Sequence, residues 1–234
     1  MCGAMRMAAF ALFGLVTATL ATPAVARTPV VVELFTSQGS SSCVKSGDVL
    51  AELGDKPNVL TLTFDVDYWD YLGWVDTFAK PEFSDRQRAY MKPLALRDVY
   101  TPQLVIDGAA EAAAVSADKI APLIRQAARN HTAPPQIQFG KARVSVGSAA
   151  RIKGGGEVWL VRYDPKDQTV QVKTGENRGQ TLVEHNVVRE LTRLGAWNGR
   201  PKVFHLPDPT ADGLNTVILL QGVHGGRILA VGRP

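Results

Sequence analysis

The chain is poor in cysteine. Only Cys2 and Cys43 occur among its 234 residues, and Cys2 lies in an N-terminal stretch that we expect to be removed. A processed chain with Cys43 alone can form no internal disulfide, even in an oxidising compartment, so its stability must come from packing. Dithiol exchange within one molecule is excluded as well, because one sulfur must form the mixed disulfide and a second must resolve it.

The chain also has few histidines and no cluster of one charge. Its 26 Lys and Arg residues are interleaved with 22 Asp and Glu residues. No basic stripe that could neutralise several phosphates is present, so nucleic acid is not an expected partner. The histidines are scattered without the spacing of metal ligands, and we expect neither a metal site nor a cofactor. These histidines are His131, His185, His205 and His224.

No hydrophobic run is long enough to span a membrane. The most apolar stretch, Ala8–Ala21, is far shorter than the ~20 residues that a spanning helix needs. Arg6 precedes this stretch and Ala24-Val25-Ala26 follows it, which is the pattern of a secretory signal cleaved before Arg27. We therefore expect residues 1–26 to be a signal peptide rather than a membrane anchor. The processed protein is then periplasmic or secreted, without stable membrane insertion.

Residues 27–132 have the pattern of an α/β domain. A Val-rich run, a segment with helical spacing and a second β-rich run follow one another, which predicts a strand–helix–strand unit with parallel strands. An aromatic and then polar segment is interpreted as a helical insertion, and a strand and an amphipathic helix follow it. These segments are Pro29–Phe35, Cys43–Leu53, Val59–Phe64, Tyr68–Arg97, Val99–Gly108 and Ala117–Arg129.

Residues 136–234 predict a smaller, mainly antiparallel β domain. Ala133-Pro134-Pro135 is a stiff connector between the two parts. Beyond it, short runs rich in Val, Ile and Leu are separated by turns, with no helices alternating between them, which is typical of a sandwich-like module. These runs are Ile137–Val146, Gly156–Tyr163, Thr169–Thr174, Val217–Gln221 and Ile228–Val231.

The junction of the first strand and the first helix carries Ser40-x-x-Cys43. Backbone N–H groups at a helix start favour anions, so a cysteine there can hold its thiolate at neutral pH, and Cys43 with Ser40 is the candidate catalytic pair. In a thioredoxin-like loop the first position faces solvent and the fourth lies one turn in, so Ser40 is expected to be exposed. The alternatives are that Cys43 is a small buried hydrophobe and that Ser40 is a helix N-cap.

A second thioredoxin-like feature is Thr101-Pro102, which stands just before a strand. In these folds a proline at this place is cis, and the residue before it exposes backbone groups that can pair with an extended peptide. We expect Thr101 and Pro102, with Asp65, Tyr68 and Trp69, to line a ligand-binding groove. The alternatives are an ordinary turn proline and aromatic rings that pack the insertion onto the sheet.

Acidic residues follow the second strand at Asp65, Asp67 and Asp70. Paired carboxylates can transfer protons. A loop with such residues more often caps the next helix, and this is the role that we expect here.

The motifs of the chain resemble those of a family of exported thioredoxin-like proteins called domain of unknown function 1223. Family members read Cys where this chain has Ser40, Pro-Pro where it has Val44-Lys45, and His where it has Asp65. The resemblance implies a thioredoxin-like fold, with a redox loop that has lost its first thiol. The motifs that carry it are Glu33 to Cys43, Val66 to Trp74, Arg86 to Tyr90, Val99 to Gln103, Gly175 to Gly179 and Asn186 to Arg189.

Two functions follow from these patterns. The first is a non-catalytic or weakly catalytic module that binds an extended peptide or an exported protein. The second is a one-cysteine thiol redox enzyme, peroxidase-like or glutathione-linked, that uses Cys43 with help from Arg97. Glutathione is therefore a further candidate partner, held at Ser40.

Overall fold

A mixed β-sheet of eight strands runs through the residues that this computed structural model describes, which are 28–130, 133–149 and 154–234. Its strand order is β13-β12-β7-β10-β2-β1-β3-β4. β1 (Val30–Thr36) and β2 (Val59–Asp65) pair in parallel, and β10 (Val187–Trp197) pairs in parallel with β2; the other neighbours are antiparallel. The expected signal segment and His131 lie outside the described residues.

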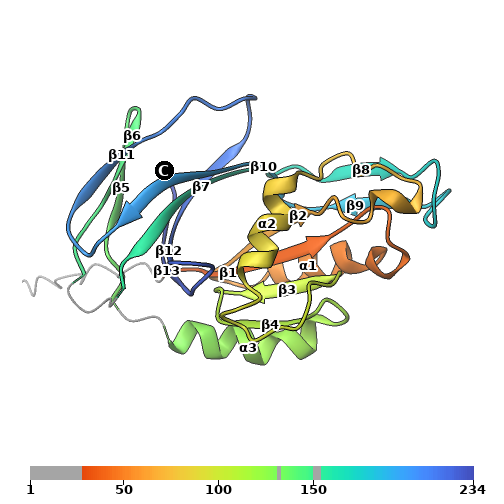
Figure 1. Ribbon diagram of the computed structural model, residues 1–234, viewed down its shortest axis with the longest axis horizontal. Helices are drawn as coiled ribbons and strands as arrows, with labels where there is room; N and C mark the ends of the chain where they lie inside the picture. The colour runs from red at the N-terminus through yellow and green to blue at the C-terminus, as the bar shows by residue number, and fades with distance from the viewer. Residues whose placement is uncertain (1–27, 131–132, 150–153) are drawn as a thin grey trace, which may run out of the picture.

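Helices cover both faces of the N-terminal half of the sheet. α1 (Ser46–Gly54) and α3 (Ala117–Arg129) pack on one face, where Leu50, Leu53 and Ile120 are buried against β1 and β3 (Gln103–Ile106). α2 (Pro81–Ala89) packs on the opposite face (Figure 1). Covering both faces explains why β1 reads as a nearly continuous apolar run.

β3 continues into β4 (Ala110–Ala113) at the edge of the sheet. Asp107 and Gly108 have positive φ angles of 49° and 62° in the turn between them, as the Asp-Gly signal predicts.

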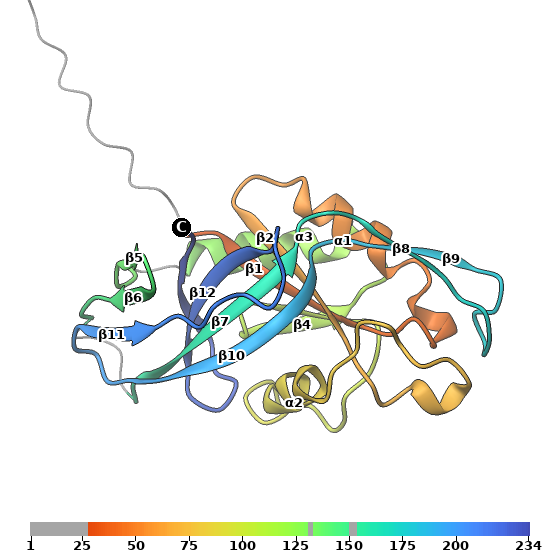
Figure 2. The same cartoon turned by 90° about the horizontal axis from the view of Figure 1, so that it is seen from above.

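The second part of the chain extends the same sheet. β7 (Gly156–Asp164), β10 and β12 (Asn215–Gly222) run side by side, with β13 (Ile228–Gly232) outside them (Figure 2). β10 meets β2 at one register pair, Val187 with Thr63. A three-stranded antiparallel sheet packs against these long strands through a separate apolar cluster. Its strands are β5 (Ile137–Gly140), β6 (Arg143–Val146) and β11 (Lys202–His205).

A hairpin of β8 (Gln168–Gln171) and β9 (Thr181–Glu184) crosses over α1. The approach is so close that a Cβ on Gly47 of α1 would lie 2.3 Å from the Val183 carbonyl oxygen. Only glycine fits at Gly47 without moving this hairpin. The hairpin thereby brings Glu184, at the end of β9, to the loop that follows β1.

The expected mixed α/β architecture with antiparallel β-strands is confirmed, and α3 has the predicted bounds. The helix expected from Cys43 begins only at Ser46, because Cys43 belongs to a short 3-10 helix (Ser41–Cys43). The expected insertion holds α2 and a 3-10 turn (Asp70–Leu72) within irregular chain. Both predicted parts contribute strands to one sheet. The division into domains 27–132 and 136–234 stays a prediction.

Among the described residues, no helix combines the length and apolar character needed to cross a membrane.

Candidate functional site

The loop between β1 and α1 holds Ser40 and Cys43, and both side chains are buried, with 7% and 5% of their surface exposed. The prediction that Ser40 faces solvent is therefore wrong. The reason is a contact from the second part of the chain: Asn177 donates hydrogen bonds from Nδ2 to the carbonyl oxygens of Gln38, at 2.8 Å, and Ser40, at 2.9 Å. The chain segment around Asn177 lies over this loop and covers it.

Hydroxyl groups surround the thiol. The Oγ atoms of Ser40 and Ser42 lie 2.9 Å apart, and Ser42 Oγ lies 3.9 Å from Cys43 Sγ. Ser40 precedes the short 3-10 helix but makes no side-chain cap hydrogen bond, so the N-cap interpretation holds for its position only. No hydrogen bond or ion pair joins Arg97 to Ser40 or Cys43 in the described part of the chain.

Buried carboxyl groups lie on the inner side of the loop. Asp65, at the end of β2, has no exposed surface, and neither carboxyl oxygen has a hydrogen-bond partner among the described residues. The prediction that Asp65 lines an open groove is wrong for this reason. Burial raises the pKa of Asp65 well above its usual value, and the negative charges of Glu184 and Asp76 raise it further.

The pKa values of the two neighbouring carboxyls are also raised. Burial raises the pKa of Glu184 to about 8, with a further contribution from the charge of Asp76. Burial raises the pKa of Asp76 to about 6, although hydrogen bonds from three backbone N–H groups act against it.

Gln38 connects this carboxyl group to the aromatic segment. Its backbone N–H donates to Asp76 Oδ2 at 2.7 Å, and its Nε2 donates to Glu184 Oε2 at 3.3 Å. Its Oε1 accepts hydrogen bonds from Trp74 Nε1 at 3.0 Å and from Thr77 at 3.1 Å and 3.2 Å. One glutamine therefore holds together segments that are far apart in the sequence.

Asp67 and Asp70 take other roles than Asp65. Asp67 Oδ1 accepts a hydrogen bond of 2.5 Å from Ser84 Oγ in α2, and Asp70 Oδ1 accepts one of 3.1 Å from the Asp76 N–H. Neither side chain caps a helix, so the expected capping role is wrong.

The second expected feature lies on the outer side of the loop. The Thr101–Pro102 peptide bond is cis. Ser42 Oγ donates to the Thr101 carbonyl oxygen at 3.2 Å, and Trp69 Nε1 donates to Thr101 Oγ1 at 2.8 Å. The rings of Trp69 and Tyr71 lie 5.9 Å apart, and Tyr71 is 75% exposed. We call these four residues, Ser42, Trp69, Tyr71 and Thr101, the Thr101 surface.

The remaining predicted groove residues are less accessible. Pro102 is buried, and Tyr68 packs on the core while its hydroxyl donates to Gln87 Oε1 at 2.9 Å. Both aromatic interpretations thus hold in part, because Tyr68 packs on the core and Tyr71 faces solvent. Thr101 is partly exposed, and its backbone N–H makes no hydrogen bond to any described residue.

The space behind Cys43 is small. A cavity bounded by Thr36, Cys43, Thr63 and Glu184 has a volume of about 10 Å³. That is about the space one water molecule needs. A substrate cannot reach Cys43 from this side.

Sequence reasoning missed Gln38, Asp76, Asn177 and Glu184. Gln38 and Asn177 carried a signal, because they lie in the Glu33 to Cys43 and Gly175 to Gly179 motifs. Glu176, in the second of these motifs, also reaches the first loop, since its Oε2 accepts a hydrogen bond of 3.3 Å from the Ser41 N–H. Glu184 is the last residue of β9, a strand without a functional motif, and only the folding of the β8–β9 hairpin places it here.

Comparison with known proteins finds a matching family and similar solved structures. A family model described as protein of unknown function (DUF1223) matches residues 31–221. A crystal structure of a protein from Agrobacterium tumefaciens is 29% identical in sequence, with a TM-score of 0.70, and the similarity covers 87% of this chain and 92% of that one. HBP35 of Porphyromonas gingivalis has a similar fold at 12% identity, with a TM-score of 0.60 over 89% of this chain and 75% of its own. No curated protein shows a significant match.

Proposed function

We propose that this chain, which belongs to the DUF1223 family, is an exported thioredoxin-like protein that binds extended peptides at the Thr101 surface and does not exchange disulfides. The thioredoxin-like assignment is supported by the order of β1, α1 and β2, by the antiparallel β3 and β4, and by the cis peptide bond just before β3. Export is supported by the signal-like pattern of residues 1–26.

The observation that carries the binding proposal is the combination of groups on the Thr101 surface. An extended peptide recognised by a protein pairs its main chain with free backbone groups and rests its side chains on neighbouring apolar surface. The Thr101 N–H has no hydrogen-bond partner among residues 28–130, 133–149 and 154–234, and Trp69 and Tyr71 supply aromatic surface beside it. Ser42, which is also exposed, adds a hydroxyl next to the Thr101 carbonyl.

The test uses a permanently unfolded chain, reduced and carboxymethylated α-lactalbumin with a fluorescent label, and follows its anisotropy. We expect saturable binding, weakened about fivefold by Tyr71→Ala because an aromatic contact contributes about 1 kcal/mol. Val203→Ala is the matched control, since Val203 is 58% exposed but lies on β11 of the separate three-stranded sheet. Absence of binding, or equal loss in both variants, would refute the proposal.

The one-cysteine redox alternative requires Cys43 to react with a peroxide or with glutathione disulfide, whereas the peptide-binding proposal does not. Because Cys43 is 5% exposed and lies beside buried carboxyls, we expect no consumption of hydrogen peroxide or glutathione disulfide. We also expect iodoacetamide to alkylate the folded protein at least tenfold more slowly than the urea-unfolded chain, as followed by mass spectrometry. Cys43→Ala should bind the unfolded chain as the wild type does. Peroxide turnover that disappears in Cys43→Ala would support the alternative instead.

A further inference from the structure

A second site lies on the face of the sheet that α2 covers. A cavity of about 380 Å³ opens between α2, the strands β7 and β10, and the turn that joins β12 to β13. This size is sufficient for a small organic molecule. The residues that bound it come from both parts of the chain. They form a polar floor, an apolar wall and an acidic rim, and His224 and Gly225 of the turn after β12 lie at one end.

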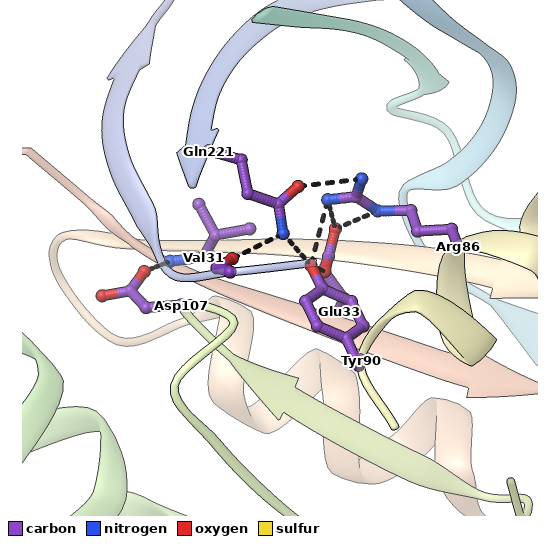
Figure 3. A network of polar contacts seen from close by, with 7 residues as sticks. Val31, Glu33, Arg86, Tyr90, Asp107 and Gln221 are labelled. Atoms are coloured by element: carbon purple, nitrogen blue, oxygen red, sulfur yellow. Dashed lines mark hydrogen bonds and ion pairs between the residues drawn. The ribbon is translucent and has the colours of Figure 1, made fainter. Parts of the chain in front are cut away.

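The floor is a buried polar network around Arg86 (Figure 3). Arg86 Nε donates to Glu33 Oε1 at 2.8 Å, and its Nη2 contacts the same oxygen at 2.6 Å and donates to the Tyr90 hydroxyl at 3.1 Å. Arg86 Nη1 donates to Gln221 Oε1 at 3.3 Å. The Arg86 and Glu33 side chains are 3% and 0% exposed, so their charges compensate each other inside the protein.

This network leaves hydrogen-bonding capacity at the cavity. A guanidinium has five N–H groups, and the contacts of Arg86 use four of them. One Nη1–H is therefore left without an acceptor in the part of the chain that the structure describes, and the adjacent Gln221 Oε1, which accepts from Arg86, has a second lone pair. A donor and an acceptor side by side suit a ligand hydroxyl, which both accepts and donates.

The apolar wall and the acidic rim determine which other chemical groups a ligand of this cavity should carry. Half-buried Trp159 and Leu191 supply apolar surface at the cavity. Glu82, Asp85 and Glu157 bound it with carboxylates; Asp85 pairs with Arg88 at 3.0 Å and Glu157 with Arg193 at 2.7 Å. Glu82 has no ion pair among the described residues, so the rim keeps an uncompensated negative charge.

The end of the cavity is closed by close backbone contact. Gly225 has φ +71°, and a Cβ there would lie 2.3 Å from the Ala89 carbonyl oxygen at the end of α2. A glycine is required for the turn after β12 to lie directly on α2. The close packing of this turn on α2 therefore fixes one end of the cavity.

We propose that this cavity binds a small aromatic amine with a hydroxyl at the end opposite its ammonium group. The hydroxyl meets Arg86 and Gln221, the ring rests against Trp159 and Leu191, and the ammonium lies at the Glu82 rim. This inference is independent of the peptide-binding proposal, because the two surfaces share no residue.

Isothermal titration calorimetry of the purified protein with three probes tests the proposal. We expect saturable binding of tyramine, binding of phenethylamine weaker by about fivefold because it lacks the hydroxyl, and no binding of 4-hydroxyphenylacetate, whose carboxylate meets the acidic rim. Equal or tighter binding of the anion, or no saturable binding of tyramine, would overturn it.

Two variants locate the binding. Glu82→Gln should weaken tyramine about fivefold, as expected for loss of one surface ion pair, whereas the matched control Glu52→Gln on α1 should not, since Glu52 lies on the opposite face and is 61% exposed. Tyr71→Ala should leave tyramine affinity unchanged. An unchanged affinity in Glu82→Gln, or a loss in Tyr71→Ala, would contradict the assignment to this cavity.

Discussion

Arg86→Met is expected to destabilise the protein by about 3–5 kcal/mol, because it leaves a buried carboxylate without a compensating charge. Glu33 has no exposed surface and receives the guanidinium of Arg86 together with the Tyr90 hydroxyl. Burial by itself lowers the pKa of Arg86, but the charge of Glu33, the contribution of Tyr90 and the hydrogen bond to Glu33 together more than offset this, so the pKa is raised. The free energy of unfolding, measured by urea denaturation at pH 7, checks the prediction.

Arg88→Met is the matched control on the same helix. Arg88 pairs with Asp85 at 3.0 Å, but the two side chains are 49% and 76% exposed, so the loss should stay below about 1 kcal/mol. The double variant Glu33→Gln, Arg86→Met should be more stable than Arg86→Met alone, because no buried charge is left unpaired. Similar losses in Arg86→Met and Arg88→Met would show that the buried pair has no special role.

Glu184→Gln is expected to stabilise the protein at pH 8–9 and to leave its stability near pH 4.5 almost unchanged. The pKa of Glu184 is raised from 4.5 to about 8 in the folded chain, chiefly by burial. The folded state therefore keeps a proton that the unfolded state releases, so wild-type stability is full below pH 4.5 and declines as the pH rises toward 8. Since one pKa unit corresponds to about 1.4 kcal/mol, the gain from removing this titration is on the order of 5 kcal/mol.

Urea midpoints of both proteins between pH 4.5 and 9 provide the measurement. Asp65 and Asp76 should leave a decline that begins above about pH 4 in the variant, because burial raises both pKa values, that of Asp76 to about 6. Glu176→Gln serves as control, since Glu176 contacts the same loop from an exposed position. A wild-type stability that does not fall between pH 5 and 8 would contradict the assignment of a buried, protonated Glu184.

Local sequence patterns predicted most helices and strands of the N-terminal part. The apolar run of β1, the helical spacing of α3 and the Asp107-Gly108 turn depend on neighbouring residues, so they can be recognised from the chain alone. β10 was missed, although it is the longest strand, because its residues alternate little and its sheet partners β7 and β2 lie far away in the sequence.

Some features of the candidate sites could be predicted from the sequence, and others could not. In a chain processed before Arg27, as we predict, Cys43 is the single thiol and no disulfide cycle within one molecule is expected, and Thr101-Pro102 marked the outer surface of the loop.

Three arrangements followed only from folding. Ser40 is buried, Asp65 faces Glu184 and Asp76, and Arg86 lies between Glu33 and Gln221. Burial and polar contacts arise between segments that are separated by up to 146 residues, as Gln38 and Glu184 are, and no local pattern encodes such a distance. Composition and spacing thus determined which chemistry the chain lacks, whereas long-range packing determined where its polar groups meet.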